Sequence, residues 1–306
     1  MDEVQEKYEA ALETLIAKVR MDPYILAAVL LGSLSHDTVW RRSDIDLLLV
    51  TQETRLKQEG LCLVELGVNI HSLLTTRSEF RRMLEGSVQG SFIHSLLVKG
   101  RMLFSREEPL VELFEARHRL SERDRATQLL RAVSSVLPGS AKAEKWFYVK
   151  RDFDYCSFWI LKCVDSLATI EVLLHGEIPG REVIHRALVL NPELFRVLYT
   201  DLLHSHATEE SLERALGLIQ SYLYAHADVL FEPVLSYLRE EGELRSMTDI
   251  NHHFSRHFNI EGVDIACEWL ADEGYLQKLA TPVRLTDKSR IEVEEAAYYF
   301  SGEKRL

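Results

Sequence analysis

Two short apolar runs, each joined to small or acidic residues at one end, constrain the fold of this 306-residue chain more than any other feature. The first run, Ile25 to Leu31, ends at Gly32-Ser33, as a buried strand does before a tight turn. The second run, Leu47 to Val50, comes directly after Ser43-Asp44-Ile45-Asp46. We therefore expect two buried strands in an α/β domain, with the turn facing the acids.

The residue types at this turn fit a phosphate and a metal ion. Gly32 lets the backbone approach a phosphate closely, and Ser33 adds a hydroxyl and an N–H donor near the start of a helix. Asp44 and Asp46 are two residues apart, so on a strand their side chains leave the same face. Mg²⁺ usually takes one or two carboxylates together with phosphate oxygens. The pattern predicts a metal–nucleotide site, and the alternative is an ordinary turn with a surface Asp pair.

Gly-Ser, a spacer and Ser-Asp-Ile-Asp-Leu together resemble the signature of the polymerase-β-like nucleotidyltransferase superfamily, in the style of its small bacterial and antibiotic-modifying members. The resemblance covers about residues 1–106 and implies an α/β domain with a mixed sheet and flanking helices. It also implies transfer of a nucleoside monophosphate from a nucleoside triphosphate to an acceptor hydroxyl, with Mg²⁺ (or Mn²⁺) and three carboxylates. The residues that it assigns to the nucleotide are Gly32, Ser33 and Ser43, and those that it assigns to the metal are Asp44 and Asp46.

The third carboxylate of that family is not evident here. It belongs on a later strand, and the matching stretch, residues 67–74, has Asn69 and His71 at its alternating polar positions. His71 is a candidate catalytic base because histidine exchanges a proton near neutral pH, and a hydrogen-bonded structural histidine is the alternative. Glu65 is a substitute acid if the register differs. With an incomplete triad, the alternative to an enzyme is a catalytically impaired nucleotide-binding relative that acts as a regulatory or protein-interaction factor.

Residues 107–228 carry helical periodicity throughout, interrupted by Pro138-Gly139, and resemble the helical-bundle partner that holds the acceptor in many small nucleotidyltransferases. Cations, acids and aromatic residues interleave from Lys142 to Tyr155, which predicts one helix face shared by Tyr148, Asp152, Tyr155 and Trp159. That face is either part of an acceptor pocket, with Asp152 or Glu144 supplying a base, or an amphipathic core helix with solvated charges. The candidate acceptor or phosphate contacts are Asn69, Lys145, Lys150, Asp152 and Tyr155. Three arginines of the first domain either face a triphosphate or are exposed helix residues: Arg77, Arg81 and Arg82.

Residues 229–306 resemble a winged helix, with helices at 234–241, 246–255 and 262–272 and a wing formed by 275–279 and 283–285. The third helix carries acids and no cation, whereas a DNA-reading helix offers arginine and lysine. We therefore expect a protein-contact or dimerisation element rather than a DNA-binding one. His252, His253 and His257 suggest a metal site, but without a cysteine or acid at matching spacing a surface cluster is the preferred interpretation.

Composition limits the partners. The net charge of −12 opposes DNA over most of the surface, although a local basic patch is compatible with it. No run of eighteen apolar residues occurs and the first residues are acidic, so neither a membrane span nor a signal peptide is expected. Four scattered cysteines predict reduced thiols in the cytoplasm. The expected partners are a nucleoside triphosphate and an unidentified acceptor, and a homodimer stays open.

Overall fold

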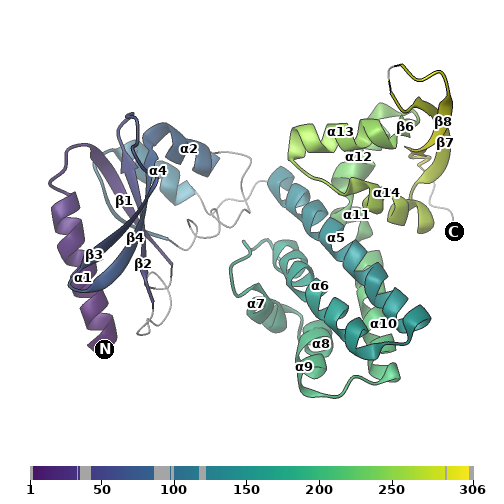
Figure 1. Cartoon of the computed structure of the whole chain (residues 1–306), viewed down its shortest axis with the longest axis horizontal. Coiled ribbons are helices and arrows are strands. Elements are labelled where there is room, and N and C mark those ends of the chain that lie inside the picture. The colour runs from purple at the N-terminus through teal and green to yellow at the C-terminus, as the bar shows by residue number, and fades with distance from the viewer. Residues whose placement is uncertain are drawn as a thin grey trace. The chain divides into compact units, whose positions relative to one another are not determined.

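The structure, a computed structural model, describes residues 3–32, 34, 43–85, 97, 100–116, 122–286 and 288–302. The chain forms two compact units, Met1–Ser121 and Glu122–Leu306 (Figure 1). The expected partition into three domains, at residues 106 and 228, stays a prediction. None of the helices among the described residues is long and apolar enough to cross a membrane.

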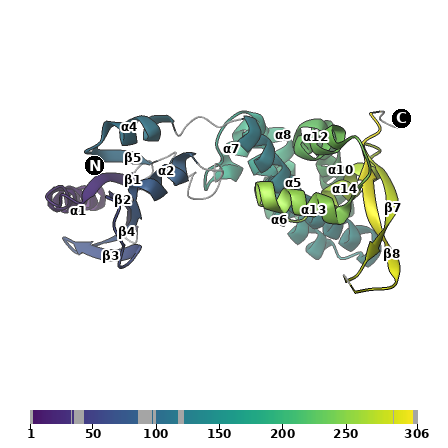
Figure 2. The same cartoon turned by 90° about the horizontal axis from the view of Figure 1, so that it is seen from above.

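The first unit is built on a five-stranded mixed sheet, as expected for its fold class. The strand order is β3-β4-β2-β1-β5, in which β2 and β4 run parallel and the other neighbours antiparallel (Figures 1 and 2). The elements are α1 (Glu3–Val19), β1 (Ile25–Leu31), β2 (Ile45–Thr51), β3 (Gly60–Glu65), β4 (Val68–Thr76), α2 (Arg77–Glu85), β5 (Arg101–Ser105) and α4 (Glu108–Glu115). The sequence from Gly90 to Lys99 predicts a further helix, and of these residues the structure describes only Leu97.

Helices cover both faces of this sheet. On one face, Ile45, Leu47 and Leu49 pack with the buried side of α1. On the other face, Leu48 and Val50 pack with residues of α2 and α4, including the fully buried Phe80 and Phe114. This alternation along β2 follows from the two-residue period of a strand. Residues of β2 with even numbers therefore lie on the α2 side of the sheet, and Asp46 is one of them.

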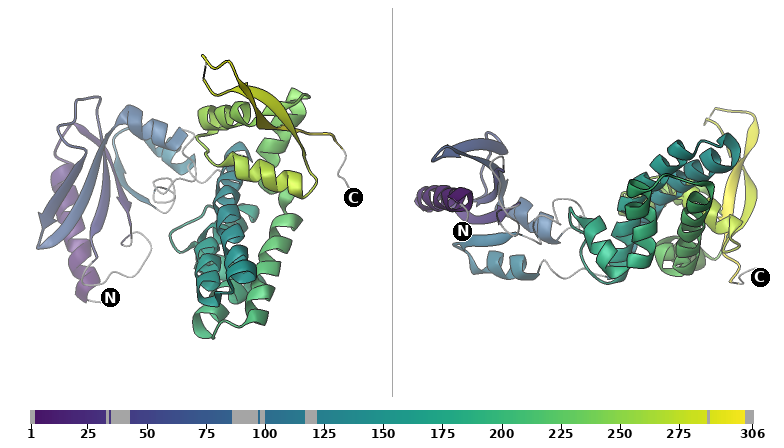
Figure 3. Two further views of the ribbon diagram at one scale, coloured as in Figure 1. Left: turned by 45° about the vertical axis from the view of Figure 1, so that its right-hand side comes forward. Right: turned by 90° about the horizontal axis from the view of Figure 1, so that it is seen from below.

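The second unit is helical before its C-terminal sheet. The long helices α5 (Glu122–Glu144) and α6 (Phe153–Leu174) pack against each other and appear side by side in teal in Figure 3. The separation of helices expected at Pro138-Gly139 is wrong, because α5 continues through both residues. A Cβ on Gly139 would lie 2.5 Å from the Sγ atom of Cys163, so this glycine lets α6 approach α5 closely. The remaining segments up to residue 241 are the π-helical turn η3 (Lys145–Lys150), α7 (Val183–Leu190), α8 (Pro192–Phe195), the π-helical turn η4 (Arg196–Asp201), α9 (Leu202–His204), α10 (Glu209–Ala225), α11 (Ala227–Leu230) and α12 (Glu232–Glu241).

A small three-stranded antiparallel sheet ends the chain, in the order β6-β8-β7. Its surroundings comprise β6 (Arg245–Ser246), α13 (Met247–Phe258), α14 (Val263–Asp272), β7 (Gln277–Arg284) and β8 (Glu292–Tyr299). The wing expected from residues 275–279 and 283–285 is wrong in detail, because residues 277–284 form one continuous strand that pairs with β8. Pro282 suggests a break in the sequence, but β7 is an edge strand, which tolerates a proline where its missing N–H would face solvent.

Candidate functional site

The two aspartates lie at the start of β2. Asp46 is half-buried between the buried residues Ile45 and Leu47, and its Cα partners are Leu31 on β1 and His71 on β4. Asp44 precedes the strand, and its side chain is 39% exposed. Both side chains therefore lie at the end of the sheet where β1 finishes and the central strand β2 begins.

Gly32 lies directly against one of these carboxylates. Its φ is +69°, and a Cβ at this position would lie 2.3 Å from the Oδ2 atom of Asp46. No side chain fits there without displacing the carboxylate, so glycine is required for the packing as well as for the backbone angle. Ser33 lies outside the described residues. Ser43 is half-buried, and its carbonyl oxygen accepts a 2.6 Å hydrogen bond from the Tyr8 hydroxyl, which ties the start of β2 to α1.

The polar residues of β4 face the aspartates. Asn69 and His71 are exposed and alternate with the buried Val68 and Ile70. The Nδ1 atom of His71 lies 4.0 Å from the Oδ2 atom of Asp44, which is within electrostatic reach but beyond hydrogen-bond distance. The parallel pairing of β2 with β4 thus brings His71 beside both acids.

Cys62 is a neighbour that the sequence gives no reason to place at this site. It is an exposed free cysteine on β3 and the Cα partner of His71. The expectation of structural thiols fits the other three cysteines, which are buried. Only the register of β3 against β4 reveals the position of Cys62.

Glu65, the substitute acid, forms an ion pair with a lysine of α1. Glu65 ends β3, where its carboxylate contacts the Lys18 ammonium of α1 at 2.5 Å and its side chain is 13% exposed. Its neighbour two residues earlier, Leu63, packs in the core on the α1 side of the sheet, so Glu65 points away from Asp46. Among the described residues, no group of three or more His, Cys, Asp and Glu side chains is arranged to hold a metal ion.

The arginines of α2 lie at the other end of the sheet. Arg77 follows the last residue of β4, and its guanidinium contacts Glu107 at 3.2 Å and Glu53 at 4.0 Å. Thr51, at the end of β2, lies five residue steps along the strand from Asp46, or about 17 Å of extended chain. Arg77, Arg81 and Arg82 line a pocket at this end together with Glu53 and Glu107, and its distance from Asp46 does not support the triphosphate interpretation of these side chains.

The helix face expected in the second unit is wrong. Arg151 adopts a left-handed conformation with φ of 54°, and Asp152 is extended, so the chain turns between η3 and α6. Asp152 caps α6 by accepting a 2.9 Å hydrogen bond from the Tyr155 backbone N–H. Tyr148 therefore lies on a different helical segment from Tyr155, and Lys145 and Lys150 are exposed on η3.

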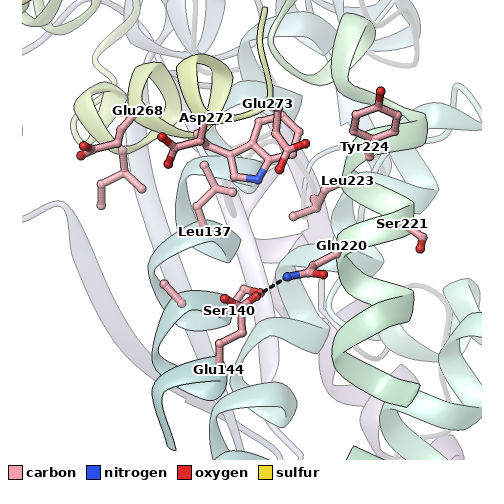
Figure 4. Close-up of a pocket in the computed structure, with 13 residues that line it drawn as sticks. Leu137, Ser140, Glu144, Gln220, Ser221, Leu223, Tyr224, Glu268, Asp272 and Glu273 are labelled. Carbon is pink, nitrogen blue, oxygen red and sulfur yellow. Dashed lines mark hydrogen bonds between the residues drawn. The ribbon is translucent and has the colours of Figure 1, made fainter. Parts of the chain in front are cut away.

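The second unit also contains a cavity of about 730 Å³ between α5, α10 and α14, shown in Figure 4. Glu144 lines it and accepts a 2.8 Å hydrogen bond from the Gln220 side chain. The acids of α14 that face it include Glu268, which forms an ion pair with Lys278. Glu144 is therefore part of an acidic cavity and is engaged within its own unit.

The histidine cluster of α13 packs against neighbouring aromatic side chains. The His253 ring stacks on Tyr237 with centroids 4.0 Å apart, and burial lowers the pKa of His253, as does the nearby His257. A lowered pKa favours the neutral ring in this contact. The stacking supports the preferred interpretation of these residues as a surface cluster.

Comparisons with known proteins agree with this geometry. The family model described as "Polymerase beta, Nucleotidyltransferase" matches residues 13–109. The chain is 22% identical over 210 residues to "Uncharacterized protein YgxA" of Bacillus subtilis (strain 168); the match spans 67% of this chain and 66%, just under two thirds, of that relative. A crystal structure of a nucleotidyltransferase-like protein from Exiguobacterium sibiricum 255-15 superimposes with a TM-score of 0.66 at 16% identity, over 96% of this chain and 99% of that one, which shows a shared fold. Residues 13–109, which contain Gly32, Asp44, Asp46 and His71, therefore belong to the polymerase beta-like nucleotidyltransferase family.

Proposed function

We propose that the first unit is a Mg²⁺- or Mn²⁺-dependent nucleotidyltransferase that transfers a nucleoside monophosphate from a nucleoside triphosphate to an acceptor hydroxyl. The observation that carries this proposal is the contact between Gly32 and Asp46. A glycine in a left-handed conformation leaves no room for a side chain beside the carboxylate, and Asp44 lies two residues away on the same edge. The family match supports the same assignment.

The donor set at this edge fits a divalent cation in part. Asp44 and Asp46 would hold the ion, since Mg²⁺ accepts one or two protein carboxylates and completes its shell with phosphate oxygens and water. When bound, such an ion neutralises charge on the phosphates and on the leaving pyrophosphate. Gly32, Ser33 and Ser43 would contact the triphosphate through the backbone and the serine hydroxyls.

His71 is the proposed base. An unprotonated ring nitrogen of His71 would accept the proton of the acceptor hydroxyl while the acceptor oxygen bonds to the α-phosphorus. The bond between the α-phosphorus and the bridging oxygen breaks, and pyrophosphate leaves with the electron pair. The exposure of His71 on the face of Asp44 supports this role, because an acceptor can reach it from solvent.

A second candidate function rests on the same strand. Asn69 and His71 occupy the positions where a third carboxylate is expected, and the described residues hold no three-ligand metal group. The alternative is a catalytically impaired nucleotide-binding relative that acts as a regulatory or protein-interaction factor. Under this alternative the acids bind the nucleotide–metal complex without turnover.

Pyrophosphate release distinguishes the two. The full chain is incubated with Mg²⁺ and each nucleoside triphosphate, with oligonucleotides, aminoglycosides or no added acceptor, and nucleotide binding is followed by thermal shift. The enzyme hypothesis predicts release by the wild type, loss with Asp46→Asn and no change with Glu59→Gln, an exposed carboxylate of the same unit. Binding without release would contradict it.

His71→Asp separates the hypotheses further. It places a third carboxylate at the Cα partner of Asp46. An impaired relative should gain pyrophosphate release in this variant. An enzyme that uses the histidine as a base should instead lose the part of its pyrophosphate release that depends on the added acceptor. If neither the wild type nor His71→Asp is stabilised by any nucleotide with Mg²⁺, both candidate functions fail.

We infer roles for the rest of the chain from its composition and secondary structure. Residues 107–228 are the proposed acceptor-binding part, with Lys145, Lys150, Asp152 and Tyr155 as candidate contacts. Residues 229–306 are proposed as a winged-helix-like protein-contact module, supported by the acids of α14 and by the helices that precede the β7–β8 hairpin. A cytoplasmic location is part of the same proposal.

A further inference from the structure

Four aromatic side chains and two lysines form one connected surface where η3 meets α6. The ring centroids of Trp146 and Tyr155 are 4.5 Å apart, those of Tyr155 and Phe158 5.5 Å, and those of Phe158 and Trp159 5.7 Å. The Nζ atoms of Lys142 and Lys162 lie 4.3 and 4.8 Å from the Trp159 ring centroid. We call the six residues the aromatic–lysine cluster: Lys142, Trp146, Tyr155, Phe158, Trp159 and Lys162.

The turn at Arg151 and Asp152 creates this surface. Because the chain reverses there, side chains from the end of α5, from η3 and from the start of α6 meet on one side of the α5–α6 pair. Tyr155 is 44% exposed and Phe158 is 46% exposed. Contiguous exposed aromatic surface marks a binding site more often than it marks a folding need.

Charge selects the class of partner. Residues 142–162 carry five basic and three acidic side chains, whereas the other 285 residues carry 31 and 45. One of the five cations, Arg151, pairs with Glu209 at 2.5 Å, but the six residues of the cluster itself include two lysines and no acid. The cluster is therefore locally positive on a strongly negative chain and suits a ligand that combines negative charge with flat aromatic groups.

We infer that the aromatic–lysine cluster binds single-stranded nucleic acid. Bases stack on the exposed rings of Tyr155 and Phe158, and the ammonium groups of Lys142 and Lys162 contact phosphates with the N–H donors that point away from Trp159. Duplexes are excluded from this mode because their bases already stack on one another. Tyr155 is also a proposed acceptor contact, but the binding inferred here is measured without a nucleoside triphosphate, so its failure and the failure of the proposed nucleotidyl transfer are distinguishable.

Fluorescence anisotropy with labelled twelve-nucleotide oligo-U and oligo-dT strands tests this on the full chain, with a twelve-base-pair duplex of each kind for comparison. Tyr155→Leu and Phe158→Leu keep apolar bulk but remove the ring, and each should weaken binding about tenfold, whereas Tyr155→Phe should bind as the wild type does. Tyr24→Leu, which changes a 62% exposed tyrosine of the first unit, is the matched control.

The lysines have a separate signature. Each phosphate contact contributes about 0.7 to the slope of log affinity against log salt for a single strand. Lys142→Gln and Lys162→Gln should each lower that slope by about this amount, and Lys288→Gln, an exposed lysine elsewhere in the same unit, should leave it unchanged. The relative affinity for oligo-U and oligo-dT identifies RNA or DNA as the ligand.

Four outcomes would overturn the inference. The first is no binding below about 1 mM in 50 mM salt, and the second is equal affinity for duplexes, which would indicate simple electrostatic attraction. The third is unchanged affinity in both leucine variants that retain the wild-type circular dichroism spectrum. The fourth is a role of the cluster in another contact, seen as a dimer that Phe158→Leu dissociates, or as binding to anionic lipid vesicles, without single-strand binding.

Discussion

Replacing Gly32 with alanine isolates the close contact on which the candidate site depends. The left-handed conformation of Gly32 costs other residues about 1–2 kcal/mol. In addition, the new Cβ would lie 2.3 Å from Asp46 Oδ2. Moving that carboxylate away from its preferred rotamer costs about 0.5–1.5 kcal/mol. We therefore expect Gly32→Ala to lower the free energy of unfolding of the first unit by about 1.5–3.5 kcal/mol.

Two other glycines of the same sheet separate these contributions. Gly67 has φ of +72°, but the nearest atom to its added Cβ is Lys7 Nζ at 3.9 Å, so Gly67→Ala should cost only the backbone part, about 1–2 kcal/mol. Gly60 has no positive φ and nothing within 4 Å, so Gly60→Ala should be close to neutral. In an Asp46→Ala background, Gly32→Ala should cost no more than Gly67→Ala does.

The measurement is hydrogen–deuterium exchange of peptides from β1 and β2 in the full chain across a urea series, because this reports the first unit separately from the second. A double-mutant cycle then gives the coupling of Gly32 with Asp46, expected at about 0.5–1.5 kcal/mol. Equal costs for Gly32→Ala and Gly67→Ala, or zero coupling, would show that the carboxylate does not lie against Gly32.

Three further predictions concern stability and reactivity. Tyr222→Phe removes a buried 2.7 Å hydrogen bond to Glu171 and should lower the free energy of unfolding by about 2 kcal/mol, measured by urea unfolding with tryptophan fluorescence. Tyr24→Phe is the exposed control. A loss in Tyr222→Phe no larger than in this control would contradict the prediction. Burial raises the pKa of Cys156 and of Cys163 to about 11, so a thiol-specific disulfide reagent at pH 8 should label the exposed Cys62 first; a fast phase that survives Cys62→Ser would refute this. The backbone N–H and hydroxyl of Thr76 lower the pKa of Glu79 below its ordinary value of 4.5. The ionised Glu79 therefore stabilises the start of α2 above pH 4.5, and this stabilisation is lost as the pH falls through the lower pKa of the folded state. Hydrogen-exchange protection of α2 should show this pH dependence in the wild type, and Glu79→Gln should remove the pH dependence.

Local patterns in the sequence predict much of the first unit. The alternation of Ile45, Asp46 and Leu47 predicts which face of β2 carries the acid, because successive side chains of a strand point to opposite faces wherever the strand lies. The glycine after an apolar run likewise predicts a turn at Gly32. The mixed sheet and its flanking helices follow from the family resemblance and are present in the structure. The catalytic roles of these residues stay predictions.

Features that depend on distant partners are not predictable in this way. Pro138 and Pro282 both suggest breaks, yet α5 continues through the first and β7 through the second. In α5, Cys163 of α6 packs closely against Gly139, next to the proline through which the helix continues. In β7 the proline is tolerated because β7 is an edge strand. Conversely, the periodic stretch from Lys142 to Trp159 reads as one helix, but it turns at Arg151 and Asp152.

Local sequence patterns are therefore enough to predict the two acids, the glycine turn and the strand on which they lie, because each depends on residues a few positions apart. The surroundings of these residues depend on the tertiary structure. His71 lies beside Asp46 because β2 and β4 pair in parallel, with the whole of β3 between them in the chain, and Glu65 is turned away because it meets Lys18 on α1. Pairing of segments distant in the chain depends on packing and register across the whole sheet, which no local pattern encodes.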